Sequence, residues 1–233
     1  MIYVMSDIHG EYEKYLAMLE KIRFSQEDTI FVLGDAVDRG KEPMKVLKDM
    51  ARRENVYFLK GNHEGMASCV LRRLNVEITE ENAEGHLDGE TMMAIMEWLS
   101  NGGGTTMKEF RALPPEEKED ILDYIDDAPL YEIVDVGEKT FVLVHAGLGN
   151  FAPGKKLREY SFDEIACMRP DYERQYFDDP SIYIVCGHTP TLAVTGKAEI
   201  YHSHNNILID CGAAFSGRLA CLCLDTMEEF YVE

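Results

Sequence analysis

The stretch that decides the fold is Thr29-Ile30-Phe31-Val32-Leu33-Gly34-Asp35-Ala36-Val37-Asp38-Arg39-Gly40. Its first five residues are β-branched or apolar, which is typical of a buried strand. A glycine ends this pattern, and two carboxylates and an arginine follow it closely. Charged side chains that follow a buried strand lie at one edge of a sheet, where ligands bind in open α/β folds.

The same arrangement recurs after four other apolar runs, at 2–5, 56–59, 141–144 and 182–185. The residues that follow are Asp7-Ile8-His9-Gly10, Gly61-Asn62-His63-Glu64, His145-Ala146-Gly147 and Gly187-His188-Thr189. Asp, Asn and His supply oxygen and imidazole nitrogen but no thiolate, which suits Mn²⁺, Fe²⁺ or Zn²⁺. We therefore expect the five loops to converge on one metal centre, in which Asp35 bridges two ions.

The rest of the chain predicts one α/β domain over residues 1–233. Apolar residues at helical spacing between Tyr12 and Ile22 separate two strand patterns, so the amino-terminal third is predicted to be βαβαβ with parallel strands. Runs at 207–210, 219–224 and 229–232 predict hairpin-type strands that form a second sheet or extend the first. The segment from about 65 to 130 has helix-forming composition, which predicts a helical insertion.

The composition is that of a globular protein with an acidic surface. The 233 residues are 45% hydrophobic, and 23 basic against 43 acidic side chains give a formal charge of -20. This charge repels nucleic acid and anionic membranes, so neither is an expected partner. The chain shows no signal peptide or membrane-spanning run, and its six cysteines lack zinc or redox spacing, so we expect a cytoplasmic protein with reduced thiols.

The ordered blocks carry a family resemblance. Those at Asp7, at Gly34 to Gly40 and at Gly61 to Glu64 resemble the signatures of the phosphoprotein phosphatase family of Ser/Thr phosphatases, within the calcineurin-like metallophosphoesterase superfamily. The blocks at His145 and His188 resemble those of bacterial and phage members, as does the segment of Trp98 with Asn101-Gly102-Gly103. The resemblance spans residues 1 to about 220. It implies a β-sandwich flanked by helices, with a helical insertion, and two divalent ions, Mn²⁺ first and Fe or Zn as alternatives.

The resemblance also implies roles for single residues. Around one metal ion it places Asp7, His9 and Asp35, and around the other Asp35, Asn62, His145 and His188. It makes His63 the general acid that protonates the leaving alkoxide, with Asp38 holding its ring, and Arg39 a clamp for phosphate oxygens.

Two assignments stay open at this point. The family uses a second phosphate-binding arginine, for which Arg169 matches the bacterial pattern best, with Arg158 and Arg174 as alternatives. His202 and His204 resemble a metal-binding tract by composition, but we expect a solvated turn before a strand.

The favoured function is that of a two-metal phosphomonoesterase acting on phosphoserine or phosphothreonine, by attack of a metal-bound hydroxide with His63 as general acid. Symmetrical diadenosine tetraphosphate hydrolases share the same blocks and form the alternative. A metal- or nucleotide-sensing module without turnover is a third hypothesis, which the complete ligand set disfavours. The blocks do not distinguish a phosphoprotein from a small phosphoester as the substrate. They also do not determine the native metal or the oligomeric state. Recognition is expected to reside in residues 65–130 and 150–180.

Two departures from the family pattern bear on the substrate. Ser6 stands before Asp7 where the family has Gly, and Ala146 stands where eukaryotic members have Gly. Neither change removes a proposed ligand. Both argue against a close eukaryotic protein phosphatase and weaken the case for a phosphoprotein substrate.

Overall fold

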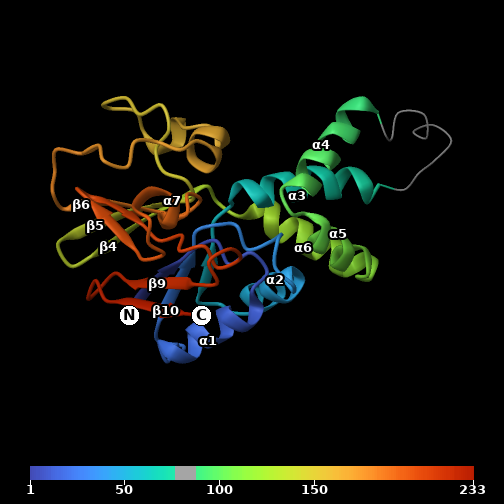
Figure 1. Cartoon of the computed structure of the whole chain (residues 1–233), viewed down its shortest axis with the longest axis horizontal. Coiled ribbons are helices and arrows are strands. Elements are labelled where there is room, and N and C mark those ends of the chain that lie inside the picture. The colour runs from blue at the N-terminus through green and yellow to red at the C-terminus, as the bar shows by residue number, and fades with distance from the viewer. Residues whose placement is uncertain (77–87) are drawn as a thin grey trace.

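The computed structural model describes residues 1–76 and 88–233, and these form two stacked five-stranded sheets (Figure 1). The first sheet has the order β10-β9-β1-β2-β3 and consists of β10 (Glu229–Val232), β9 (Leu219–Cys223), β1 (Ile2–Met5), β2 (Thr29–Val32) and β3 (Val56–Phe58). The second has the order β4-β5-β6-β8-β7 and consists of β4 (Tyr131–Val136), β5 (Lys139–Val144), β6 (Ile182–Cys186), β8 (Asn206–Leu208) and β7 (Tyr201–Ser203). His86, which the sequence predicts to be exposed, lies outside the described residues.

Parallel pairing runs from β1 to the edge strand β3 in the first sheet, with antiparallel strands on the other side of β1, whereas in the second sheet antiparallel strands flank a parallel middle. β1 pairs in parallel with β2, and β2 with β3, while β5, β6 and β8 form the parallel part of the second sheet. The helices α1 (Tyr12–Lys21) and α2 (Pro43–Ala51) connect the first three strands. This architecture confirms the predicted α/β fold class. The three predicted late strands divide between the sheets: β8 belongs to the second sheet, whereas β9 and β10 extend the first.

Alternating side chains on the strands build the layers. Val4 and Phe31 of the first sheet meet Phe141 and Val185 of the second in the core between the sheets. Their strand neighbours, such as Met5, point the other way and pack against α1 and α2. Because successive side chains leave a strand on opposite faces, strands buried on both faces show the continuous apolar runs found in the sequence.

Between β3 and β4 the chain forms four helices, which make a lobe at one side of the two sheets (Figure 1). They are α3 (Asn62–Leu74), α4 (Gly89–Ser100), α5 (Gly104–Arg111) and α6 (Pro115–Asp127). Leu122 and Ile125 of α6 are fully buried in the core that this lobe shares with α1 and α2. On the surface, Arg72 of α3 forms ion pairs with Glu119, Asp123 and Asp126 of α6.

Two edge strands, β4 and β7, were not expected from the sequence. The prediction of a solvated turn was wrong for His202, which lies within β7 and pairs with Glu229 of β10 at 2.8 Å, but His204 does lie in the turn that leads to β8. The polar residues of β7 lack the apolar signal by which buried strands are recognised. β4, in contrast, contains Ile133, Val134 and Val136, so its apolar signal was present and went unrecognised. Within residues 1–76 and 88–233, no helix has both the length and the apolar character needed to cross a membrane.

Candidate metal centre

The loops that follow β1, β2, β5 and β6 are joined to one another by backbone hydrogen bonds. The Asp7 amide donates to the Gly34 carbonyl at 3.1 Å, and the His9 amide donates to the Asp35 carbonyl at 2.8 Å. In the second sheet, the Gly187 amide donates to the His145 carbonyl at 2.7 Å. The two sheets meet where the His188 amide donates to the Asp7 carboxylate at 2.9 Å. The structure therefore brings the predicted strand-end loops together at one site.

Two histidines are oriented as metal ligands usually are. His9 donates from Nδ1 to the Val37 carbonyl at 2.8 Å, and His145 donates from Nδ1 to the Leu33 carbonyl at 2.6 Å. Each ring thus presents Nε2 to the site. Metal-binding histidines typically use their second nitrogen in this way, because the hydrogen bond fixes both the ring orientation and the tautomer.

Asp35 lies at the centre of the site, with one carboxylate oxygen toward each side. Its Oδ2 is 3.6 Å from His9 Nε2, and its Oδ1 is 3.4 Å from His145 Nε2. The described residues contain two groups of side chains able to hold a metal ion, His9 with Asp35 and His63, and Asp35 with His145 and His188. Asp35 is common to both groups, as a bridging carboxylate must be.

The remaining proposed ligands lie around these groups. The Asn62 side-chain oxygen is 3.0 Å from His145 Nε2 and 2.9 Å from His188 Nδ1. Donor atoms separated in this way fit a shared ion at about 2.1 Å from each. The other oxygen donor, Asp7 Oδ1, is 3.9 Å from His9 Nε2. The other five side chains that the sequence proposes as ligands therefore lie around Asp35 or belong to one of the two groups that contain it.

The electrostatics of the site favour bound cations. Burial, with the charge of Asp35, raises the pKa of Asp7 to about 6. Burial alone would lower the pKa of His145, but the Asp35 carboxylate outweighs it and raises that pKa to about 10. Burial lowers the pKa of His9 to about 3, so its ring is neutral and offers a lone pair. Closely buried carboxylates call for positive charge, and the proton on His145 supplies part of it. A divalent ion bound to that imidazole would replace the proton, because a ligating histidine must be neutral.

Backbone strain is concentrated in the same loops. Six of the ten non-glycine residues with positive φ in the described part of the chain are proposed site residues, namely Asp7, His9, Asp35, Asp38, Arg39 and His188. This conformation costs non-glycine residues roughly 1–3 kcal/mol each and persists only where the surrounding structure enforces it. The buried Glu64 carboxylate helps to hold the strained backbone in place. It accepts hydrogen bonds from the amides of Asp35, Ala36, Val37 and Gly61.

Glu64 is one of the residues to which the sequence analysis assigned no role. It is fully buried at the start of α3, where burial and the charge of Asp35 raise its pKa to about 7. A glutamate at the third position of a helix is half of a capping box. Glycine rather than serine or threonine precedes this helix, so the sequence shows only that half of the pattern.

The proposed general acid is held by a buried network. His63 Nδ1 donates to Asp38 Oδ2 at 2.7 Å, which turns Nε2 toward Asp35, 3.9 Å away. Asp38 accepts two further hydrogen bonds, from Trp98 Nε1 at 2.8 Å and from the Thr106 hydroxyl at 2.6 Å. His63, Asp38, Trp98 and Thr106 are all buried. Helices α4 and α5, which carry Trp98 and Thr106, therefore fix the carboxylate that orients His63. In the sequence, Trp98 is marked only by the family resemblance, and no pattern distinguishes Thr106.

The proposed phosphate clamp also depends on the helical lobe. The Arg39 amide donates to the carbonyl of Gly102, between α4 and α5, at 3.0 Å. A side chain at Gly102 would meet Arg39 Cγ at 2.7 Å, so the close approach requires glycine. The Arg39 guanidinium reaches His9 Nε2 and lies 4.7 Å from the ring centre of Phe215. Its charge is therefore placed at the mouth of the candidate metal centre.

The structure separates the three candidates for the second arginine. Arg169 donates from Nε to the Thr189 hydroxyl at 3.2 Å, directly beside His188. Arg174 instead lies over the rings of Phe151 and Tyr176, and Arg158 belongs to a short 3-10 helix, Leu157–Glu159. Among the three, Arg169 has the contact that places it next to a proposed ligand.

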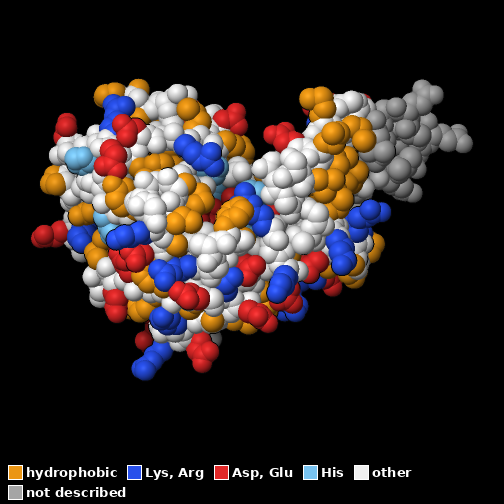
Figure 2. Space-filling view, viewed as in Figure 1, with side chains coloured by type: hydrophobic (Ala, Val, Ile, Leu, Met, Phe, Trp, Pro, Cys, Tyr) orange, Lys and Arg blue, Asp and Glu red, His pale blue; other side chains and the backbone are white. Residues whose placement is uncertain are grey.

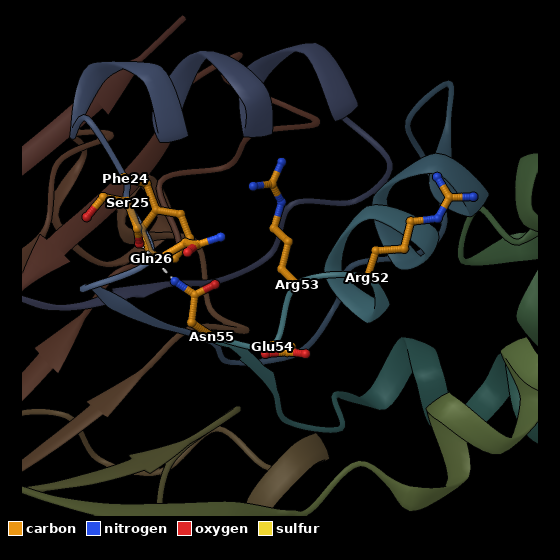
Figure 3. Close-up of a pocket in the computed structure, with 7 residues that line it drawn as sticks. All are labelled: Phe24, Ser25, Gln26, Arg52, Arg53, Glu54 and Asn55. Atoms are coloured by element: carbon orange, nitrogen blue, oxygen red, sulfur yellow. Dashed lines mark hydrogen bonds between the residues drawn. The ribbon is translucent and has the colours of Figure 1, made fainter.

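A separate hollow of about 740 Å³ lies at the opposite ends of the strands (Figure 3). It is lined by residues 24–26, which precede β2, and by residues 52–55, which precede β3. Arg53 points into this region but is paired with Asp49 at 2.6 Å. Asn55 donates to the carbonyls of Ser25 and Asp28, so it ties the two connections together. The proposed site residues lie at the carboxyl ends of the strands, away from this hollow.

Comparison with known proteins gives a consistent result. A family model described as calcineurin-like phosphoesterase matches residues 1–211. The chain is 28% identical over 247 residues to the asymmetrical bis(5′-nucleosyl)-tetraphosphatase PrpE of Geobacillus thermodenitrificans, with 94% of this chain and 88% of the relative covered. It is 24% identical to the protein of the same name from Bacillus cereus, with 98% and 92% covered.

Solved structures share the fold at lower identity. A protein provisionally named a diadenosine tetraphosphatase superposes with a TM-score of 0.68 at 18% identity, covering 99% of this chain and 92% of the other. A serine/threonine phosphatase from Saccharomyces cerevisiae superposes with a TM-score of 0.58 at 13% identity, covering 100% and 79%. At these identities, the structural matches support the fold and not a substrate.

Proposed function

The chain belongs to the calcineurin-like phosphoesterase family and is a metal-dependent phosphoesterase, and on this premise we propose that it hydrolyses dinucleoside tetraphosphates asymmetrically, to a nucleoside triphosphate and a nucleoside monophosphate. The similarity to asymmetrical bis(5′-nucleosyl)-tetraphosphatases over 94% of the chain carries this proposal. The preference for phosphoserine or phosphothreonine expected from the sequence has support only from a shared fold. The proposed cleavage also differs from the symmetrical one considered in the sequence analysis.

Two divalent ions are proposed to be held by the six ligands. Asp7, His9 and Asp35 would hold one ion, and Asp35 with Asn62, His145 and His188 the other. When bound, such ions polarise phosphoryl oxygens and lower the pKa of a water molecule. We propose Mn²⁺ as the native ion, because the donor set has carboxylate, amide and imidazole groups but no thiolate.

His63 is proposed to supply the proton for bond cleavage. In the reaction, a water molecule gives up one proton to the solvent and its oxygen forms a bond to phosphorus, while the phosphorus–oxygen bond to the departing nucleotide breaks. His63 Nε2 gives its proton to the departing oxygen and takes up another from the solvent afterwards. Burial lowers the pKa of His63, but the Asp35 and Asp38 carboxylates outweigh it and raise the pKa above the ordinary value of 6.5. The raised pKa favours the protonated form of the ring, which is the form that a general acid needs.

Arg39 and Arg169 are proposed to bind the phosphate chain from opposite sides. Arg39 follows β2 of the first sheet, and Arg169 contacts Thr189 after β6 of the second sheet. Guanidinium groups bind phosphate oxygens through paired hydrogen bonds. Two of them across the metal centre would hold one phosphate of the substrate in line with the attacking water.

The proposal is tested by product analysis. The purified protein with Mn²⁺ is incubated with diadenosine tetraphosphate, and the products are separated by ion-exchange chromatography. We expect equal amounts of ATP and AMP. ADP as the only product would show symmetrical cleavage, and a higher kcat/KM for a phosphothreonine peptide would show that the sequence-based substrate was right.

Hydrolysis in water labelled with ¹⁸O identifies the phosphorus atom that is attacked. Label in AMP would show attack on the phosphorus next to the nucleoside, and label in ATP would show attack on the neighbouring phosphorus. The Asp35→Asn variant serves as the blank, so that a contaminating hydrolase is recognised.

A further inference from the structure

An exposed aromatic side chain stands at the entrance of the site. Phe215 leaves 66% of its surface accessible, although one part of its ring is covered by the Arg39 guanidinium at 4.7 Å. Figure 2 shows a hollow between the sheet body and the helical lobe, where basic, acidic, histidine and hydrophobic side chains meet. An aromatic ring that stays exposed forgoes the stabilisation that burial of its apolar surface would give. Phe215 is such a ring, beside the proposed phosphate-binding arginine.

The loop that carries Phe215 is held in place from both sides. Its backbone turns at Gly212, with φ of +78°, and the Phe215 amide donates to the Gly212 carbonyl at 2.9 Å. Buried Asp210 accepts from the Gly212 amide at 2.8 Å. From outside, Lys14 of α1 donates to the Ala213 carbonyl at 3.1 Å. The exposed ring is thus presented by a fixed turn that packs against the proposed site.

We propose that Phe215 is a stacking platform for one nucleobase of the substrate, a specificity-determining contact that rests on the proposed function. A 5′-phosphate bound at Arg39 is separated from its base by a single ribose. The Phe215 ring is a flat apolar surface that is largely exposed and lies 4.7 Å from that guanidinium. A base stacked there would extend the existing pair of Arg39 and Phe215 by one further planar group.

The charge of the molecule explains why such a contact is useful. The chain carries a formal charge of -20, so its long-range field opposes the approach of a tetraphosphate. Arginine and metal contacts are made to phosphate oxygens, which a nucleotide, a phosphopeptide and an inorganic phosphate chain all have. Stacking on an aromatic ring is little affected by charge and favours the ligand that carries a base.

The experiment compares ligands that differ only by the base. AMP and ribose 5-phosphate are titrated into the Mn²⁺-loaded enzyme by calorimetry, for the wild type and for Phe215→Leu. We expect the variant to lose roughly 5- to 150-fold in affinity for AMP, the span found when an aromatic partner is removed from a base. The loss for ribose 5-phosphate should be at least several-fold smaller. Phe215→Trp, which keeps a stacking surface, should restore AMP binding.

Turnover provides a second comparison, between diadenosine tetraphosphate and inorganic tetraphosphate. Phe215→Leu should lower kcat/KM for the dinucleotide more than for the inorganic chain. Tyr57→Leu is the matched control, because Tyr57 is 51% exposed on β3 and stacks on Phe31 instead of a site residue. Equal losses for both ligands of either pair would overturn the stacking role. A wild type that leaves the dinucleotide intact but binds AMP through Phe215 would overturn the proposed function alone.

Discussion

The strand-end loops and the helical lobe contribute to the candidate site in different ways. The loops after β1, β2, β5 and β6 carry proposed ligands on short, strained segments that hydrogen-bond directly to one another. The lobe carries a proposed ligand only at Asn62, the first residue of α3. Its α4–α5 junction acts from outside, through Trp98 and Thr106 on Asp38 and through Gly102 on Arg39.

We therefore expect the strand-end loops and the helical lobe to have different roles in catalysis. The strand-end loops carry all the proposed metal ligands except Asn62, and the lobe contacts the proposed proton donor's partner Asp38 and the proposed phosphate clamp Arg39. Variants in the first region should therefore lose metal together with activity. Variants at the α4–α5 junction should keep the metal and lose only part of the activity.

The largest effect is expected for Asp35→Asn. Asparagine cannot bridge two cations with charged oxygens, so the variant should lose at least one ion and lower kcat/KM by more than about 10⁴-fold, since the ions supply several kcal/mol of transition-state stabilisation. Metal content by mass spectrometry and hydrolysis of diadenosine tetraphosphate are measured on the same preparation. Asp135→Asn on the exposed strand β4 is the control. Two tightly bound ions in Asp35→Asn would contradict the bridging assignment.

His63→Asn tests the boundary between the two regions. This side chain lies beside a proposed ligand but is oriented by Asp38, so the variant should retain both ions while kcat falls roughly 10²- to 10⁴-fold, the usual contribution of a general acid. Rates are compared on a good and a poor leaving group. The loss should be greater on the poor leaving group, and an equal rate on that substrate would rule out proton donation by His63. His202→Asn, on β7, controls for loss of an exposed imidazole.

Trp98→Phe and Thr106→Val test whether the lobe acts on catalysis at all. Each change removes one hydrogen bond to the Asp38 carboxylate, which is worth about 1.5–3 kcal/mol when one partner is charged. We expect kcat to fall about 10- to 100-fold with little change in metal content or in KM. Thr105→Val is a matched control, since the buried Thr105 hydroxyl has no hydrogen-bond partner among the described residues. Loss of metal in either variant would show that the two regions are not separable.

The convergence of the strand-end loops could be predicted from the sequence because its signal is local. Each loop follows an apolar strand run, and a ligand type, a glycine and the end of the run stand within a few residues of one another. Where Gly61 approaches Asp35, an added Cβ would lie 2.3 Å from the carboxylate oxygen, so the glycine is part of the same local pattern. The α/β fold followed from the same runs, since buried parallel strands are continuous in apolar sequence.

Contacts distant in sequence could not be predicted in this way. Thr106 meets Asp38 across 68 residues, and nothing in the surrounding helix-forming segment marks that threonine. Phe215 lies 176 positions from Arg39, and a single aromatic residue in a glycine-containing turn has no periodicity. Edge strand β7 was missed because its polar residues are exposed. The positions of such residues depend on how the sheets and the lobe pack, which a one-dimensional pattern does not contain.

The smallest effect is expected at the attachment of the lobe, where Asp126 of α6 accepts hydrogen bonds from Ser68 and Arg72 of α3. Partial burial raises the pKa of Asp126, but these bonds outweigh it and hold the pKa below the ordinary value of 3.8. The carboxylate therefore stabilises the folded chain above pH 3.8, and this contribution is lost as the pH falls through the lower, folded-state pKa. Because Asp126 and Arg72 are both more than a third exposed, solvent screens the pair and limits its worth.

Asp126→Asn should accordingly lower the free energy of unfolding at pH 7 by less than about 1 kcal/mol. Urea unfolding of the metal-free protein, followed between pH 7 and pH 3, should show the difference from wild type shrinking below pH 3.8 as the wild-type carboxylate becomes protonated. Asp127→Asn, at the next and exposed position, is the control. A difference that stays constant over this range would mean that Asp126 acts through packing rather than charge. Unchanged metal content in the variant would then show that the lobe can be loosened at its far attachment without disturbing the loops that form the metal centre.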